Sequence, residues 1–332
     1  MHEFIRDLLQ CPQCGGGLAW SVTVRQGERI VEGEAQCAVC AATYPIHEGI
    51  GLFLTPDLPR NDLWEQAGSR LTGYLRDHPD VERRLMDVPP ETLGPADLFF
   101  RAAVLEDRGD YAHVRELLDR AHEGLYTEEY RNCLARELSA VVERLRIGDE
   151  PIVDLACGRG VLVERLAEAL DRPIIATDFS PRILRRNRRW LEYWGLYDRV
   201  SLLGFDARRT PFKNGVIRML TTNLGLPNIE EPARLLEELR RIVSGTLLAI
   251  SHFYPENDAL NAAEIRAAKL DTMLYLRPTL DAFKAAGWQV SLEDRCIAHA
   301  QPTPAGAVIE GASIDSLPVA PTALEWGVLV AR

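Results

Sequence analysis

A short apolar run that breaks into two closely spaced glycines is the feature that most constrains the fold of this chain. Residues 152–154 read as a buried strand, residues 156–160 as a turn and residues 161–170 as an amphipathic helix. A strand that opens into a glycine turn and a helix forms a ligand-binding crevice at the carboxyl end of a parallel strand. Gly158 and Gly160 let a ligand approach the backbone because they carry no Cβ. Alone, this pattern allows any nucleotide-like ligand.

The residues around the turn narrow the choice of ligand. A dinucleotide fingerprint requires a small third residue, but Val163 occupies that position. A dinucleotide would also place its pyrophosphate at the helix N-terminus. Asp154 instead puts a carboxylate beside the crevice, which suits a cationic ligand. S-adenosylmethionine (SAM) carries an ammonium and a sulfonium and no phosphate, so we expect SAM with its ammonium near Asp154.

A second strand–helix unit follows closely. Residues 173–178 form an apolar run that ends in Asp178, 24 residues after Asp154. That spacing is close to a βαβ unit, which takes about 30 residues. A carboxylate at the end of the second strand can accept hydrogen bonds from both ribose hydroxyls. We therefore expect Asp178 to hold the ribose and Ser180 to cap the next helix, which begins at Pro181.

The pattern repeats along the chain. Residues 200–205 predict a third strand, and Asp206 and Ala207 at its end could frame an adenine. Residues 216–222 predict a fourth strand that ends at Asn223, beside the expected position of the cofactor methyl group. Strands that alternate with helices imply a parallel sheet whose faces are both covered.

These residues resemble the class I SAM-dependent methyltransferases, especially their ubiquinone/menaquinone-biosynthesis-like branch. The loop of that family, D-x-x-C-G-x-G, is matched by residues 154–160, and its D-A pair by residues 206–207. The resemblance covers about residues 150–332. It implies a Rossmann-like, seven-stranded α/β sheet whose last strand, residues 323–331, is antiparallel to its neighbours.

The resemblance also implies which residues contact the cofactor. The expected SAM-binding residues are Asp154, Ala156, Gly158, Gly160, Asp178, Phe179, Ser180, Asp206, Ala207, Asn223 and Leu224. The chain departs from the family at Ile217 and Arg218, where a Phe-Asp pair usually enters the fourth strand. That departure concerns the start of the strand and leaves the expected cofactor contacts untouched.

Four of the seven cysteines form two C-x-x-C pairs. They are Cys11, Cys14, Cys37 and Cys40, with 22 residues between the pairs. This spacing is typical of a four-thiolate structural zinc site. The alternative is two disulfides, but the N-terminal residues do not read as a secretory signal and no apolar stretch reaches the length of a membrane span. We therefore expect a cytoplasmic protein, with no membrane partner, whose cysteine pairs bind zinc.

The segment around these cysteines resembles a second family, the small zinc-ribbon proteins that bind and activate methyltransferases. The match covers about 55 residues and ends in Tyr-Pro-Ile-x-x-Gly-Ile at residues 44–50. We expect a zinc-ribbon domain over residues 1–55, with His47 outside the ligand set because four thiolates complete the site. Cys133 and Cys296 read as ordinary buried cysteines.

The middle of the chain reads as a helical linker or cap over residues 56–147, followed by the methyltransferase domain over residues 148–332. Helices are expected over residues 97–105, 113–122 and 127–145, and prolines interrupt the earlier part. This region could shape the substrate pocket or act as a spacer. Residues 301–322, rich in Pro, Ala and Gly, predict a long loop that is either a lid or disordered.

Charge and composition bear on the partners. The net charge of −11 argues against a broad phosphate-binding surface, although five arginines cluster at residues 182–189. We expect this cluster to be a solvated helix face that pairs with nearby acids, and a local nucleic-acid site is the alternative.

Three functions stay open on the sequence. The first is methyl transfer to a small-molecule acceptor, and the second is methylation of a ribosomal- or transfer-RNA base with help from the ribbon. The third is a non-catalytic, SAM-binding partner protein. Methyl transfer needs a base only if the acceptor must lose a proton. His252 and Tyr254, just after a fifth strand expected over residues 246–251, are the catalytic candidates. The oligomeric state is left open.

Overall fold

A computed structural model describes residues 1–58 and 61–332 of the chain, and its described strands form one mixed sheet. The strands are β1 (Leu18–Gln26), β2 (Arg29–Cys37), β3 (Thr43–His47), β4 (Ile50–Leu52), β5 (Ile152–Asp154), β6 (Ile174–Asp178), β7 (Val200–Gly204), β8 (Ile217–Asn223), β9 (Val243–Phe253), β10 (Val290–Ala300) and β11 (Thr322–Ala331). Their order is β1-β2-β3-β4-β7-β6-β5-β8-β9-β11-β10, which makes eleven strands where seven were expected.

Seven of these strands build the predicted α/β sheet. β7, β6, β5, β8 and β9 are parallel, and β11 is antiparallel to both β9 and β10, as predicted. Every residue of β6 and β7 is buried, because helices cover both faces of a parallel sheet. The chain order reverses between β5 and β8, and the carboxyl ends of strands at such a point form a ligand crevice.

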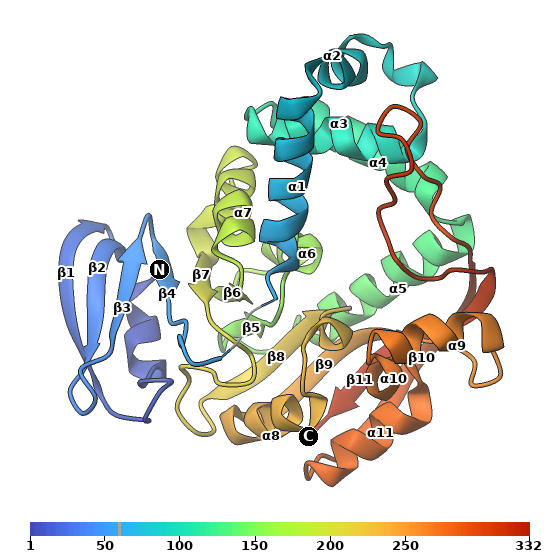
Figure 1. The fold of residues 1–332 in the computed structure, drawn as a ribbon. Coiled ribbons are helices and arrows are strands. Elements are labelled where there is room, and N and C mark those ends of the chain that lie inside the picture. Colours follow the sequence, from blue (N-terminus) through green and yellow to red (C-terminus); the bar gives the residue numbers. More distant parts are fainter. Residues whose placement is uncertain (59–60) are drawn as a thin grey trace.

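The N-terminal segment continues the sheet instead of standing apart from it. β1 to β4 form an antiparallel meander, and β4 then pairs in parallel with β7, with Ile50 opposite Leu202. The amide of Phe53 donates to the carbonyl of Gly204 at 2.6 Å. Phe53 is fully buried in one hydrophobic cluster with Leu203 and the residues of the ribbon. The seven-stranded expectation was therefore wrong because the N-terminal residues 1–55 share hydrogen bonds and core with the sheet, and Figure 1 shows their strands continuing it beyond β7.

Helices cover the two faces. They are α1 (Leu63–Asp77), α2 (Pro79–Asp87), α3 (Pro95–Asp107), α4 (Tyr111–Leu125), α5 (Glu128–Arg144), α6 (Val161–Ala169), α7 (Pro181–Tyr193), α8 (Pro232–Ile242), α9 (Ala259–Ala267), α10 (Asp271–Leu274) and α11 (Leu276–Ala285). The apolar sides of α5, α6 and α7 pack in one core cluster, and those of α8 and α11 in another.

The middle region is helical, as expected. The predicted helices correspond to α3, α4 and α5, while α1 and α2 fill the segment that prolines were expected to interrupt. Pro79 lies at the first turn of α2, where its missing N–H is not needed. In Figure 1, α1 to α4 form an arm above the carboxyl ends of the central strands, and α5 runs from this arm back along β10, β11 and β9.

The long segment between β10 and β11 folds against this arm. Val308 and Ile314 pack on the cluster formed by α3 and α4, and Figure 1 shows the segment rising to meet these helices. Residues 301–322 therefore form an ordered loop.

A disulfide links two cysteines that are far apart in the sequence, one on a helix and one on a strand. The structure joins Cys133 on α5 to Cys296 on β10, so the expectation of two ordinary cysteines was wrong. The two residues lie 163 positions apart, and the pairing depends on how α5 packs across β10, which no local pattern reveals. Within the described residues, no helix has the length and apolar character needed to cross a membrane.

Candidate cofactor site

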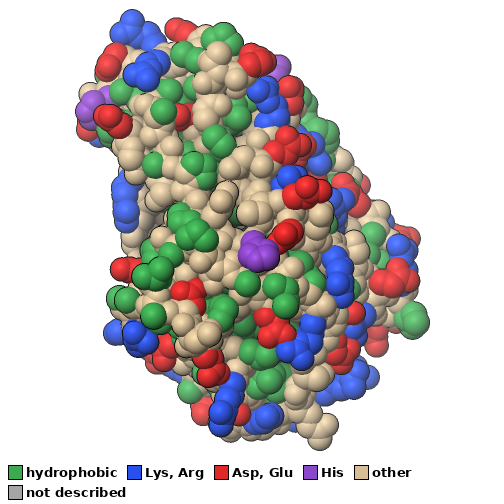
Figure 2. Space-filling model, turned by 90° about the vertical axis from the view of Figure 1, so that its right-hand side faces the viewer, with side chains coloured by type: hydrophobic (Ala, Val, Ile, Leu, Met, Phe, Trp, Pro, Cys, Tyr) green, Lys and Arg blue, Asp and Glu red, His purple; other side chains and the backbone are tan. Residues whose placement is uncertain are grey.

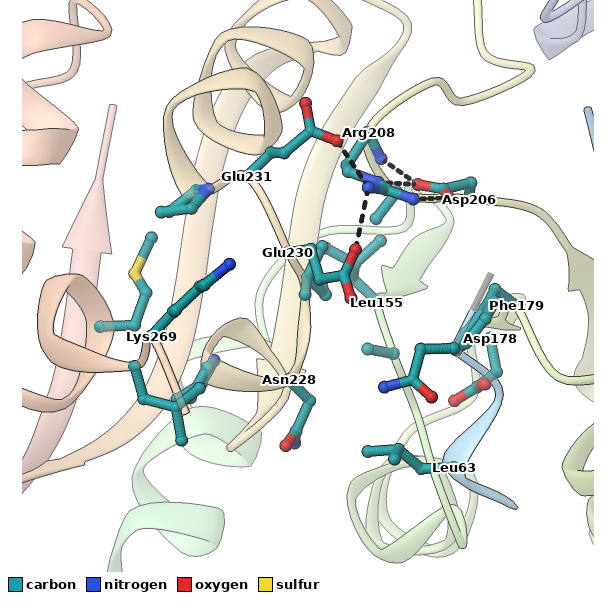
Figure 3. Close-up of a pocket in the computed structure, with 18 of the residues that line it drawn as sticks. Leu63, Leu155, Asp178, Phe179, Asp206, Arg208, Asn228, Glu230, Glu231 and Lys269 are labelled. Atoms are coloured by element: carbon teal, nitrogen blue, oxygen red, sulfur yellow. Dashed lines mark hydrogen bonds and ion pairs between the residues drawn. The ribbon is translucent and has the colours of Figure 1, made fainter. Parts of the chain in front are cut away.

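A cavity of about 720 Å³ opens at the carboxyl ends of β5, β6 and β7 (Figure 3). Small-molecule sites usually measure roughly 300–1,000 Å³, so the space is adequate for a nucleoside-sized ligand together with a small second molecule. Among the predicted cofactor residues, Ala156, Asp178, Phe179, Asp206 and Ala207 line it. The structure thus brings together residues from three separate strand ends.

The glycine loop is shaped by left-handed backbone conformations. Ala156, Gly158 and Gly160 have φ values of 49°, 49° and 78°. Gly160 stands at the start of α6, and the amide of Cys157 donates to the carbonyl of Thr177 at 2.8 Å. Left-handed backbone is where glycine is favoured. The loop therefore adopts its bend because two of its residues lack side chains.

Asp178 is held beside this loop. Its Oδ2 accepts a hydrogen bond from the Gly158 amide at 3.0 Å, and its Oδ1 accepts one from the Ser180 amide at 3.0 Å. Burial raises the pKa of Asp178 to about 6, while these amide hydrogen bonds oppose the rise. Ser180 occupies the N-cap position of α7, but its hydroxyl makes no capping bond and has no partner. The expected side-chain cap is therefore absent at Ser180.

Asp154 lies beneath the loop and not on the described cavity wall. Its Oδ1 accepts a hydrogen bond from the Thr221 hydroxyl at 2.7 Å, and its Oδ2 has no partner. Burial raises the pKa of Asp154 to about 7. A buried carboxyl with a free acceptor oxygen is a strong site for a positive charge or a proton.

Asp206 takes part in an ion network that the sequence did not predict. Both of its carboxylate oxygens accept hydrogen bonds from the Arg208 guanidinium, at 3.0 and 2.7 Å. The same guanidinium reaches Glu231 at 2.6 Å and Glu230 at 3.4 Å (Figure 3). The carboxylate partners raise the pKa of Arg208. An Arg two residues after Asp206 was visible in the sequence, but its partners on the segment before α8 were not.

Other cavity residues come from distant parts of the chain. Asn61 and Leu63 lie at the start of α1, Lys269 and Met273 lie around α10, and Ser316 lies in the 301–322 loop. No motif marks these positions, because their contribution depends on how three remote segments fold over the sheet.

The remaining predicted residues lie away from the described wall. Asn223 ends β8, and its side-chain oxygen has no partner, while Leu224 has a φ of 55°. The imidazole of His252 on β9 packs 4.9 Å from Trp326, and burial lowers its pKa to about 4. Tyr254 lies 6.1 Å from His252, measured between ring centres. His252 and Tyr254 are thus brought together in an aromatic cluster, and neither lines the cavity.

The four paired cysteines converge at the far end of the sheet. The sulfur atoms of Cys11, Cys14, Cys37 and Cys40 all lie within 4.8 Å of one another. All four are free, which argues against the disulfide alternative. The amides of Cys40 and Val39 point toward the Cys37 sulfur and lower its pKa to about 6. A four-thiolate set of this size fits a tetrahedral zinc ion, whose ligand bonds are about 2.3 Å.

His47 takes no part in the cysteine cluster. Its Nδ1 lies 2.9 Å from a Glu32 carboxylate on the exposed face of the ribbon. Its exclusion from the expected ligand set agrees with this placement.

Residues 152–245 match the family model described as a methyltransferase domain. This segment is therefore similar to methyltransferase domains. It contains the glycine loop, Asp178 and Asp206, so these site residues lie inside the matched part.

Curated relatives each match a limited share of the chain, from 28% to 39%. A demethylmenaquinone methyltransferase of Clavibacter sepedonicus is 35% identical over 108 residues, which cover 32% of this chain and 42% of that protein. A carboxy-S-adenosyl-L-methionine synthase of Erwinia tasmaniensis is 29% identical over 134 residues, covering 39% and 54%. The chain thus spans about half, or less, of the length of the curated relatives it matches.

A solved structure is also similar. It is a SAM-dependent methyltransferase from Aquifex aeolicus, with 14% identity and a TM-score of 0.42, over 67% of this chain and 98% of that one. This level of similarity carries no argument about the activity of the chain.

Proposed function

We propose that the whole protein is a SAM-dependent methyltransferase that acts on a small-molecule acceptor. The observation that carries this proposal is the cavity with Asp178 and Asp206 on its wall, inside the matched methyltransferase domain. The buried carboxyl of Asp154 below the glycine loop, with an oxygen that has no partner, favours a ligand that carries an ammonium. A demethylmenaquinone methyltransferase among the relatives is named for a small-molecule acceptor, which favours the same class here.

In the proposed complex, each part of the cofactor has a counterpart in the site. Asp178 would accept hydrogen bonds from the ribose hydroxyls, and Asp206 with Ala207 would frame the adenine. The methyl group would then face the ends of β8 and β9, near Asn223 and Leu224. Methyl transfer is an in-line displacement with a neutral leaving group, so proximity and orientation supply much of the rate.

His252 and Tyr254 stay candidates for a catalytic role. Burial keeps the His252 imidazole neutral at pH 7, and its Nδ1 has no hydrogen-bond partner. A neutral imidazole with a free nitrogen can accept a proton, and because His252 does not line the described cavity, this role requires the acceptor to reach past the cavity wall. Replacing His252 by Ala should lower kcat while leaving SAM affinity unchanged.

Three of the five arginines of α7 are engaged in ion pairs, which gives little support to RNA as the acceptor. Arg186 pairs with Glu106 at 2.6 Å, and Arg188 pairs with Glu192 at 2.8 Å and Glu48 at 3.3 Å. These guanidiniums link α7 to the arm and to the ribbon and are not presented to phosphates. Figure 2 shows acidic and basic side chains interspersed on the face it displays, with no broad basic area.

A third candidate keeps the cofactor without methyl transfer. The relative named as a carboxy-S-adenosyl-L-methionine synthase indicates that similar sequences serve other chemistry on SAM-type compounds. The chain keeps an acidic residue at the end of each of three strands, namely Asp154, Asp178 and Asp206, which argues for cofactor binding in either case.

We also propose that the four-cysteine cluster holds one structural zinc ion and that the protein is cytoplasmic. Four free thiols grouped within 4.8 Å are the support for the metal. Such pairs bind metal in reducing compartments, which is the support for the location.

Two measurements test the proposed function. Titration calorimetry with SAM should show binding by the zinc-loaded protein, and absence of binding would refute both enzymatic hypotheses. Incubation with methyl-labelled SAM and fractionated cell extract should then place the label in the small-molecule fraction. Label in RNA would favour the second candidate, and binding without any transfer would favour the third.

A further inference from the structure

One end of α3 contacts the glycine loop through a largely buried ionic cluster. Glu106 receives the Arg159 guanidinium on both oxygens, at 3.0 and 3.1 Å, and the Arg186 guanidinium at 2.6 Å. Arg159 is the residue between Gly158 and Gly160. Burial alone would raise the pKa of Glu106, yet the two arginines hold it below its usual value. Glu106 is thus an ionised carboxylate that fixes a loop residue.

The second contact ties this cluster to the backbone of the loop. Arg186 also donates to the Arg159 carbonyl at 2.7 Å, and Asn187 donates to the Gly158 carbonyl at 2.7 Å. The side chain and the backbone at residue 159 are therefore both held, and Glu106 orients the guanidiniums that hold them.

The opposite end of α3 contacts the loop between β10 and β11. Asp97 is fully buried, and its carboxylate accepts hydrogen bonds from three consecutive amides, those of Ala307, Val308 and Ile309, at 2.8, 3.0 and 3.1 Å. A carboxylate that satisfies three amides fixes the course of a loop strongly. Ser316 of this loop lines the cavity.

We propose that α3 positions two walls of the cavity: Glu106 positions the glycine loop on the cofactor side, and Asp97 positions the 301–322 loop on the side that receives the acceptor. Both are positioning residues outside the matched domain, and the assignment of the two sides rests on the proposed function. It gives the arm a role in the site, in place of a spacer.

The two carboxylates should have separable effects. Loss of the Glu106 charge leaves Arg159 and Arg186 close together without their common partner, so the glycine loop should shift and SAM should bind more weakly. Loss of the Asp97 charge leaves three loop amides poorly satisfied, so the 301–322 loop should open while the glycine loop keeps its contacts.

The test compares Glu106→Gln, Asp97→Asn and the control Asp107→Asn in the full-length, zinc-loaded protein. Asp107 lies on the same helix and pairs with Arg182 at 3.7 Å, with two thirds of its side chain exposed. We expect Glu106→Gln to weaken SAM at least tenfold by calorimetry. Asp97→Asn should speed amide hydrogen exchange at residues 307–309 at least tenfold with SAM affinity changed less than twofold, and the control should change neither.

Unchanged SAM affinity in Glu106→Gln, or unchanged exchange in Asp97→Asn, would overturn the proposal. If Glu106→Gln does not fold, the double variant Glu106→Gln/Arg159→Gln removes one positive charge with the negative one and should fold with the same loss of affinity. If the native protein itself binds no SAM, the proposed function fails. The positioning by Glu106 is then still measured by faster amide exchange at residues 157–160 in Glu106→Gln, and equal exchange rates would refute it.

Discussion

The indole of Trp64 lies directly against Gly158. A β-carbon built on Gly158 would come within 3.2 Å of the Trp64 Cζ2 atom, in a backbone conformation with φ of 49°. Trp64 is in the first turn of α1, so the arm contacts the glycine turn against which the proposed cofactor would lie. Glycine at this position therefore meets two requirements, one of backbone conformation and one of space.

Replacing Gly158 by Ala should weaken SAM binding and lower the melting temperature by a few degrees. The left-handed backbone alone costs a residue with a Cβ about 1–2 kcal/mol, and the contact with Trp64 adds to this. Gly195→Ala is the matched control, because Gly195 has φ of 68° with no atom within 4 Å of an added β-carbon. The melting temperature is measured by thermal unfolding and the SAM affinity by calorimetry. If both fall equally in the two variants, the Trp64 contact contributes nothing.

Replacing Asp178 by Ala should weaken SAM binding at least tenfold, which corresponds to about 1.4 kcal/mol. The substitution removes the proposed acceptor for the ribose hydroxyls and frees the amides of Gly158 and Ser180. Asp198→Ala, on the short turn before β7, should leave affinity unchanged. Calorimetry measures the SAM affinity of both variants. A native-like affinity in Asp178→Ala would mean that the ribose contact has been misassigned.

Stability should depend on pH through Glu137. This residue is fully buried on α5, one of its oxygens has no partner, and burial raises its pKa from 4.5 to about 7. Between these two values the folded chain keeps a proton that the unfolded chain loses, so the free energy of unfolding falls as the pH rises.

Glu137→Gln stays neutral and should remove this part of the pH dependence. We expect it to be about 1–2 kcal/mol more stable than the native protein at pH 8, with little difference at pH 5. Urea unfolding at both values provides the measurement, and Glu143→Gln, an exposed change on the same helix, is the control. Parallel curves for the native protein and Glu137→Gln would contradict the assignment.

Removing the proposed zinc should destabilise more than the ribbon. Structural zinc contributes its binding free energy to folding, and β4 is hydrogen-bonded to β7 and shares a core with it. A chelator, or Cys37→Ser, should therefore lower the melting temperature of the whole protein. Elemental analysis should find one zinc per native chain and less than a tenth of that in the variant. Cys157→Ser, outside the ribbon, should keep its metal, and a metal-free native protein with an unchanged melting curve would refute the proposal.

The sequence predicted the parts of the site that depend on local order. A strand, a glycine turn and a helix follow one another along the chain, so the loop at residues 156–160 and the ends of β6 and β7 were placed correctly. The helix starts were also close, because Pro181 and Pro232 each occupy the first turn of their helices. The ribbon cysteines were found because ligand spacing is itself a local pattern.

The parts that were missed depend on contacts between remote segments. The pairing of β4 with β7 joins residues about 150 positions apart, and hydrophobic periodicity does not predict which strands pair. Arg208 could be seen as a charge near Asp206, but its contact with Glu231 requires α8 to be placed. Lys269 lines the cavity only because α9 ends where it does. Contacts between residues far apart in the sequence therefore could not be predicted before the fold was known.

The ribbon also changes where another chain could pair with this protein. β7 would be an open edge of a seven-stranded sheet, and β4 covers it, so the edges of the described sheet are β1 and β10. On the ribbon side, a strand added by hydrogen bonding would have to pair with β1. That strand lies four strands from β7, roughly 19 Å away at about 4.8 Å per strand. β1 carries register shifts near Val24, and irregularities of this kind discourage such pairing. Recruitment of a partner by strand addition there would leave the mouth of the cavity clear.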